Sequence, residues 1–134
     1  PNSIFIHCER DPKDNCLSIF KNLFEDGEGW KYNETELIEY YKLYSEIMRF
    51  WNSKYKDGIL KVKYEELVNN SEREIKKIIN YCKLDWDENC LYHHKNKQPI
   101  KTLSFNQANK PIYSSSIKSS DNFKNFLKEI FSAF

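Results

Sequence analysis

The chain has 134 residues, the size of a single domain with one hydrophobic core. Its 21 Lys and Arg residues nearly balance its 20 Asp and Glu residues, and the resulting net charge of +1 argues against a strongly basic nucleic-acid-binding protein. Apolar residues make up 40% of the chain and aromatic residues 16%, with only 3 Gly and 4 Pro, which excludes a disordered or fibrous protein.

Signals for export and membrane insertion are lacking in the sequence. No stretch approaches the ~20 apolar residues that cross a bilayer, and the first residues have no basic region followed by a long apolar run. We therefore expect a cytoplasmic protein with no membrane or nucleic-acid partner. A chain of this length does not need disulfides, so free thiols are expected at all four cysteines. These are Cys8, Cys16, Cys82 and Cys90.

The first elements expected are a strand, a tight turn and a helix. Residues 4–6 form a short β-prone run, IFI, which predicts a buried strand of the parallel type. Asp11 and Pro12 predict a helix start, because Asp accepts hydrogen bonds from first-turn amides and Pro fits the first helical position. Apolar residues at helical spacing continue this helix to an expected end near Asp26-Gly27. They are Cys16, Leu17, Phe20, Leu23 and Phe24.

A long helix, a second strand and a third helix are expected next. Thr35 is expected to cap the long helix, which ends at a turn in Asp57-Gly58. Residues 59–64 predict the second strand, and the capping-box pattern from Ser71 to Glu74 predicts the start of the third helix. One stripe of the long helix is apolar or aromatic and is expected to face the core. The stripe consists of Leu37, Tyr41, Tyr44, Met48, Trp51 and Tyr55.

The rest of the chain is expected to be mostly loop until its end. Periodicity is weak from residue 90 to residue 120, where we expect one or two short helical turns. From Phe123 to Phe134 the apolar spacing predicts a terminal helix that docks on the core. Strands separated by helices indicate an α/β fold.

The histidines do not suggest a metal site. His93 and His94 lie near Cys82 and Cys90, but their spacing does not match a structural zinc site, so no metal is expected. His7 falls within the first strand, where a role in the core or at the sheet edge is expected.

Arg10 follows the first strand, and ligands of open parallel sheets bind at the carboxyl ends of strands. Ser18 lies two helical turns further on, on the same face as Asp11 and Asp14. A guanidinium and a hydroxyl so placed can hold one phosphate, because the guanidinium offers paired donors. The alternative, which spacing alone favours, is that Arg10 pairs with Asp11 or Asp14 and Ser18 bonds within its own helix.

Residues 6–20, IHCERDPKDNCLSIF, resemble the 3′-phosphate-binding segment of sulfotransferases that use 3′-phosphoadenosine 5′-phosphosulfate (PAPS). In that family an Arg after a strand and a Ser eight residues later bind the 3′-phosphate, and Arg10 and Ser18 occupy those places. Residues 60–67, LKVKYEEL, resemble the segment whose Tyr lies near the adenine. This implies that Tyr64 stacks on or bonds the purine. The alternative for Tyr64 is simple packing against a helix.

A third segment, residues 104–113 (SFNQANKPIY), is similar to a loop that closes over the nucleotide. The similarity is to the branch containing protein-tyrosine sulfotransferases and bacterial sulfotransferases with tetratricopeptide repeats. It matches Ser104 and Lys110 to positions that contact the donor, where an ammonium offsets phosphate charge. The alternative for Lys110 is a solvated loop residue. Altogether the resemblance extends from about residue 3 to residue 120.

The resemblance implies a partial three-layer α/β/α fold like that of P-loop nucleoside triphosphatases, helix-rich with few parallel strands. Residues 1–134 are expected to be the C-terminal part of one sulfotransferase domain, truncated at the N-terminus. The implied donor is PAPS, the implied product is 3′-phosphoadenosine 5′-phosphate (PAP), and no metal is needed. The acceptor is a small molecule, carbohydrate or protein with a hydroxyl or amine. We expect a truncated domain to expose part of its core surface, so self-association of the chain through that surface stays an open alternative.

The glycine-rich turn that binds the 5′-phosphosulfate in this family is not found in the sequence. The catalytic base is expected upstream of Pro1, so the chain alone is expected to be inactive. Two alternatives stay open. One is a non-catalytic nucleotide- or protein-binding module of the same origin, and the other is a different nucleotide-dependent transferase of similar architecture.

Overall fold

A computed structural model describes residues 3–22, 29–56, 58–96 and 109–134. The chain divides into two compact units. The sheet unit comprises Pro1–Glu9 and Leu60–Ser114. The helical unit comprises Arg10–Ile59 and Ser115–Phe134. The chain is thus helix-rich with a small parallel sheet, an α/β arrangement as predicted.

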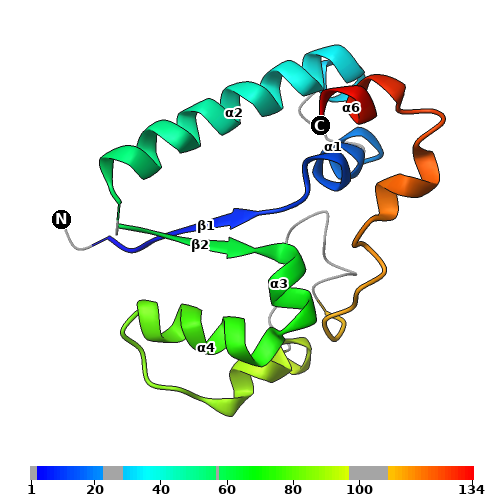
Figure 1. Cartoon of the computed structure of the whole chain (residues 1–134). Coiled ribbons are helices and arrows are strands. Elements are labelled where there is room, and N and C mark those ends of the chain that lie inside the picture. Colours follow the sequence, from blue (N-terminus) through cyan, green and yellow to red (C-terminus); the bar gives the residue numbers. More distant parts are fainter. Residues whose placement is uncertain (1–2, 23–28, 57, 97–108) are drawn as a thin grey trace. The chain divides into compact units, whose positions relative to one another are not determined.

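Two parallel strands, β1 (Phe5–Glu9) and β2 (Ile59–Lys63), form the sheet and lie side by side (Figure 1). Both strands were predicted, but the expected burial of the first is wrong. Phe5 is 59% exposed, and Ile4 and Ile6 are also exposed. Parallel strands become buried only where other elements cover both of their faces. In the described part of the chain, these three side chains have no such cover.

Two helices follow β2 in the sheet unit, α3 (Tyr64–Asn69) and α4 (Ser71–Tyr81), and they contact each other. The short helix α3 was not predicted. The start of α4 was predicted correctly, but the capping box was wrong. The N-cap is Asn70, without a side-chain cap bond, and the Ser71 hydroxyl donates to the Val68 carbonyl at 3.4 Å.

The first helix of the helical unit, α1 (Pro12–Phe20), begins as predicted. The Asp11 carboxylate accepts from the amides of Lys13 at 3.0 Å and Asp14 at 3.1 Å. The expected end near residue 26 is wrong, because the helix ends at Phe20. The Asn22 side-chain amide donates to the Ser18 carbonyl, an acceptor that a longer helix would use. Leu23, Phe24, Asp26 and Gly27 lie outside the described residues.

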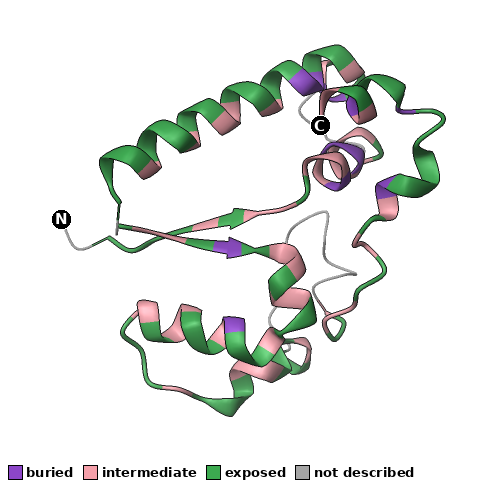
Figure 2. Cartoon of the chain, viewed as in Figure 1, coloured by how far each residue is buried: buried purple, intermediate pink, exposed green. Residues whose placement is uncertain are grey.

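The 21-residue helix α2 (Glu34–Lys54) is buried only near its N-terminal end, beside α1 and α6 (Lys128–Ala133) (Figure 2). Its cap is Asn33, whose side chain accepts from the Glu36 amide at 3.1 Å, so the expected Thr35 cap is wrong. The predicted core stripe is correct at Leu37 but wrong at Trp51 and Tyr55, which are exposed. A single apolar stripe cannot be buried where no element of the unit covers it.

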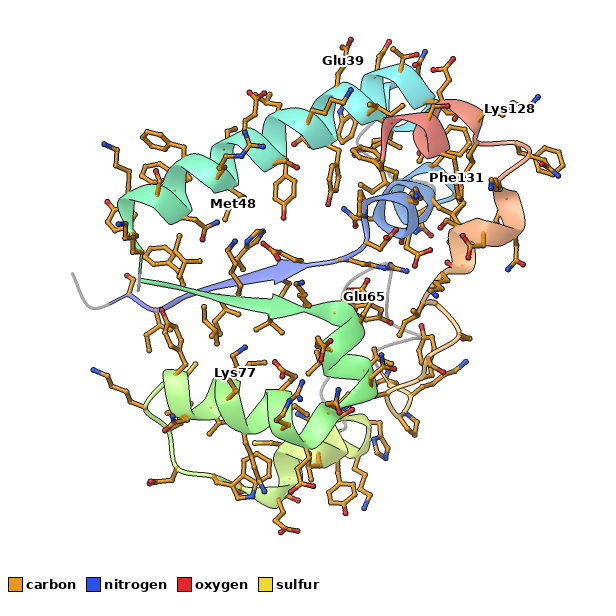
Figure 3. All side chains as sticks on the ribbon, viewed as in Figure 1. Glu39, Met48, Glu65, Lys77, Lys128 and Phe131 are labelled. Atoms are coloured by element: carbon orange, nitrogen blue, oxygen red, sulfur yellow. The ribbon has the colours of Figure 1, made fainter. Side chains whose placement is uncertain are left out.

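The terminal helix docks as predicted, although α6 itself is shorter than expected and follows a 3₁₀ segment, η3 (Ser119–Phe123). The Phe131 ring, labelled in Figure 3, has the Lys13 ammonium 5.2 Å from its centroid. Phe126, by contrast, is 79% exposed, contrary to expectation. Buried residues from α1, α2 and this C-terminal segment form the core of the unit. They are Cys16, Leu17, Leu37, Ile38, Leu127 and Ile130.

Two further 3₁₀ segments, η1 (Gly29–Tyr32) and η2 (Glu88–Lys95), complete the described structure. The η2 segment agrees with the expectation of short helical turns between residues 90 and 120, as far as that stretch is described, whereas η3 begins only at Ser119 and continues beyond residue 120. Among the described helices, none is long and apolar enough to span a bilayer.

Candidate functional site

The parallel strands end at the same end of the sheet, and the predicted ligand-binding residues follow them directly. Arg10 is the residue after β1, and Tyr64 is the residue after β2 and the first of α3. In open parallel sheets this end carries the ligand. Arg10 therefore has the backbone position that the sequence predicted, whereas Tyr64, expected as the last residue of the second strand, is instead the first residue of α3.

The Arg10 side chain is fixed within the helical unit by a contact distant in sequence. Its Nη2 donates to the Ser116 carbonyl at 2.7 Å. The Arg10 carbonyl accepts from the Tyr41 hydroxyl of α2 at 3.4 Å. Arg10 is also half-buried. The contact with Ser116 therefore holds its guanidinium in place, two residues before α1 begins.

Ser18 lies on α1 four residues after Asp14, so these two residues share a face of the helix, while Arg10 lies just before the N-cap Asp11. Ser18 is half-buried, and its carbonyl is bonded to Asn22. The amides of the first turn of α1 are already bound by Asp11. An anion at this site would therefore meet the side chains of Arg10 and Ser18 rather than these amides.

Asp14 is the most buried charged residue of this face, with 1% exposure. Its Oδ2 accepts from the Lys118 amide at 2.6 Å. Its Oδ1 accepts from the Ser120 amide at 2.8 Å and from the Ser119 hydroxyl at 3.3 Å. One carboxylate thus binds a segment more than 100 residues away along the chain.

Burial acts to raise the pKa of Asp14, but its hydrogen bonds from Ser120 and Lys118 act in the opposite direction. The positive charge of Arg10 adds to them, and the net pKa lies below its ordinary value. The alternative expectation that Arg10 interacts with Asp14 is thus met as a charge interaction. The hydrogen bonds of the carboxylate go to the other segment.

The remaining predicted donor-site residues belong to the sheet unit. Tyr64 is half-buried at the start of α3. Lys110 is exposed, and its carbonyl lies 3.0 Å from Nε2 of His93. Ser104 lies outside the described residues. The donor-binding roles of these residues stay predictions.

The histidines and cysteines add no metal site in the described part of the chain, where no cluster of three metal-ligating side chains occurs. His7 is nearly buried on β1, and its Nδ1 lies 3.4 Å from the Glu9 carboxylate, which also faces the Lys61 ammonium at 3.4 Å. Cys16 is fully buried, and burial, with the negative charge of Asp11, raises the pKa of its thiol to about 12. An inert structural thiol results.

The sequence reasoning missed the segment from Ser116 to Ser120. It noted that Asp14 shares a face with Ser18, but no local pattern identifies partners 104 to 106 residues away. The only local signal is the run of small polar residues at 114–120, SSSIKSS, which is also typical of a solvated loop.

Comparisons with known proteins place the chain in a family. The family model described as "Sulfotransferase family" matches residues 1–88, which include β1, α1, β2 and α4. An uncharacterized protein of Aquifex aeolicus (strain VF5) is 26% identical over 133 residues. The alignment covers 97% of this chain but 18% of that protein. No solved structure matches the chain significantly. Since the family model spans well over half of its length, the chain belongs to the sulfotransferase family.

Proposed function

We propose that this chain supplies the 3′-phosphate and adenine side of the donor site of a PAPS-dependent sulfotransferase. The observation that carries the proposal is the placement of Arg10 directly after β1, with its guanidinium held by Ser116 and with Ser18 on the helix that follows. Family membership supports sulfonate transfer in general. The chain spans less than a fifth of its Aquifex relative, so activity of a whole protein is part of the proposal.

The side chains of Arg10 and Ser18 suit a phosphate monoester. A guanidinium carries five N–H donors, and a bidentate phosphate contact uses two of them. The hydroxyl of Ser18 on α1 adds a neutral donor. Since Asp11 is bound to the first-turn amides and Asp14 to residues 118–120, both neighbouring carboxylates are hydrogen-bonded to donors of the chain itself.

In the proposed enzyme, PAPS supplies a sulfonate group that passes to an acceptor hydroxyl or amine as the bond to the 5′-phosphate breaks and PAP leaves. Arg10 and Ser18 bind the donor far from the reacting sulfur and orient it. Tyr64 orients the adenine. Lys110 and Ser104 offset charge near the 5′-phosphate. The acceptor is a small molecule, a carbohydrate or a protein, and its proton goes to a base that we do not place in this chain.

The test is an NMR titration of the isotopically labelled chain with PAP and, separately, with 5′-AMP. Shifts near Arg10 and Ser18 should require the 3′-phosphate, because 5′-AMP lacks it. Arg10→Ala should weaken PAP binding about tenfold to a hundredfold, the effect of losing a charged hydrogen bond of roughly 1.5–3 kcal/mol. Arg49→Ala removes the same charge from an exposed site on α2 and should leave the affinity unchanged.

A 3′-phosphate preference lost in Arg10→Ala and kept in Arg49→Ala would support the proposal. A spectrum that responds equally to PAP and 5′-AMP would overturn it. Equal weakening of PAP binding by Arg10→Ala and Arg49→Ala would also overturn the proposal, because binding would then depend on net charge alone.

A further inference from the structure

A buried carboxylate, that of Asp14, lies midway in sequence between the two predicted phosphate ligands. Asp14 and Ser18 are four residues apart on α1 and share a helix face, and Arg10 lies four residues before Asp14, just ahead of the N-cap Asp11. An Asp14 carboxylate that faced the bound phosphate without hydrogen-bond donors of its own would repel the phosphate. The presence of a carboxylate at this position is therefore not explained by helix formation alone.

The contacts of Asp14 supply that reason. Its two oxygens accept three hydrogen bonds, all from residues 118–120. Two residues before this segment, the Ser116 carbonyl accepts from Arg10 Nη2 at 2.7 Å. The Asp14 carboxylate thus holds residues 118–120 against α1. The same stretch of chain, through Ser116, binds the Arg10 guanidinium.

The backbone of the anchored segment is strained. Lys118 has a φ of 56°, in the left-handed region that disfavours residues with a Cβ. Such a conformation persists where surrounding contacts determine it. The hydrogen bond from the Lys118 amide to Asp14, at 2.6 Å, is such a contact.

We propose that Asp14 is a positioning residue of the 3′-phosphate site, holding residues 116–120 against α1 so that Ser116 keeps the Arg10 guanidinium in its binding position. This inference rests on the proposed function, since it concerns the same site. Asp14 acts through Arg10 and does not itself contact the phosphate.

The experiment compares the ratio of the dissociation constants of 5′-AMP and PAP, which isolates the contribution of the 3′-phosphate. Asp14→Asn keeps the size of the side chain but replaces one acceptor oxygen by an NH₂ group, which cannot accept from the Lys118 amide. We expect the ratio to fall about tenfold, with the 5′-AMP constant unchanged. A purely electrostatic role predicts the opposite sign, because removing a negative charge near the phosphate would raise the ratio.

A double-mutant cycle tests whether Asp14 acts through Arg10. In the Arg10→Ala background, Asp14→Asn should have no further effect on the ratio. Glu34→Gln is the matched control, because Glu34 also accepts from a distant backbone amide in the helical unit, that of Ile130 at 3.3 Å. This control should keep the wild-type ratio. If Asp14→Asn does not fold, Ser119→Ala removes one donor and should lower the ratio two- to threefold.

The outcomes separate the two proposals. If Arg10→Ala abolishes the preference for PAP while Asp14→Asn keeps or raises it, the role of Asp14 is wrong and the donor site stands. An equal loss of affinity for both nucleotides in Asp14→Asn also contradicts the positioning role, since it indicates general destabilisation. If Arg10→Ala leaves the ratio unchanged, or if wild type shows no preference for PAP, the donor site itself is wrong and the role of Asp14 falls with it.

Discussion

Asp14 gives the chain an acid-sensitive stabilising contact at the scale of a single residue. Its pKa is lowered in the folded chain, so the folded state binds its proton less tightly than the unfolded state does. Its contribution to the free energy of unfolding is thus fully present above about pH 4, the ordinary range of an Asp. That contribution is lost as the pH falls through the lowered value.

Asp14→Asn should therefore lower the free energy of unfolding by about 1–3 kcal/mol at pH 7, the cost of leaving buried donors unsatisfied. The difference from wild type should begin to shrink below about pH 4, where the unfolded wild-type chain takes up a proton at Asp14, and should shrink further as the folded chain does so at its lowered pKa. Urea unfolding, monitored by circular dichroism at pH 7 and at pH 3, measures the difference in the free energy of unfolding at each pH. A difference that is the same at the two pH values would contradict the assignment of the lowered pKa.

The residues of the candidate site differ in how far sequence alone could identify them. Arg10 and Ser18 fall in one short segment, so their spacing and resemblance predict their role without knowledge of the fold. Ser116 and Lys118 could not be identified, because their relation to α1 depends on a chain reversal about 100 residues later. Thr35 was misplaced as a cap by two residues, and its hydroxyl instead donates to the Glu129 carboxylate at 2.6 Å.

At the scale of elements, α2 has one buried end and one exposed end. Leu37 is fully buried, whereas Leu43, less than two turns further along, is 54% exposed. Leu37→Ala should lower the free energy of unfolding by about 2–5 kcal/mol, because it removes buried apolar surface and leaves a cavity. Leu43→Ala, the same change on the same helix, should cost about 0.5 kcal/mol or less.

Chemical denaturation of the two variants at several protein concentrations measures this difference. Equal costs would contradict the described burial of α2. A concentration-dependent cost at Leu43 would also contradict it, since it would mean that a second copy of the chain covers this face.

The helix α4 ends in a common C-capping motif that has Lys83 at the position usually taken by Gly. The Lys83 amide donates to the Asn80 carbonyl at 3.0 Å, and the Leu84 amide donates to the Ile79 carbonyl at 3.1 Å. Lys83 has a φ of 57° at the position where Gly is usual.

Lys83→Gly should therefore raise the free energy of unfolding by about 1 kcal/mol, because Gly adopts this backbone conformation without steric cost. The same replacement at Lys77, inside α4, should lower it by about 1 kcal/mol. Thermal unfolding of both variants tests the assignment. Destabilisation by Lys83→Gly would show that the left-handed conformation at this position is wrong.

At the scale of the whole molecule, the order of elements was largely predictable, whereas their burial was predictable only in part. Periodicity and capping residues predicted both strands, the start of α1 and the start of α4, since these depend on neighbouring residues. The exposure of Ile4, Phe5 and Ile6 depends on which elements cover β1, and no local pattern encodes this. The helix α3 was missed because six residues are too few to show a helical period.

The family match spans β1 through α4, so it includes the predicted Arg10 and Ser18 pair and Tyr64 but not Lys110. Evidence for the third donor-binding segment therefore comes from its sequence resemblance alone. The central claim of the account is accordingly the recognition of the 3′-phosphate by Arg10.

The most direct measurement of that claim observes the ligand itself. PAP has two phosphates with separate ³¹P NMR signals, so mixing it with the chain reports on each one. We predict that the 3′-phosphate signal shifts and broadens more than the 5′ signal, and that this effect is lost in Arg10→Ala but kept in Arg49→Ala. Equal responses of the two signals, or a 3′ response that survives in Arg10→Ala, would contradict the account.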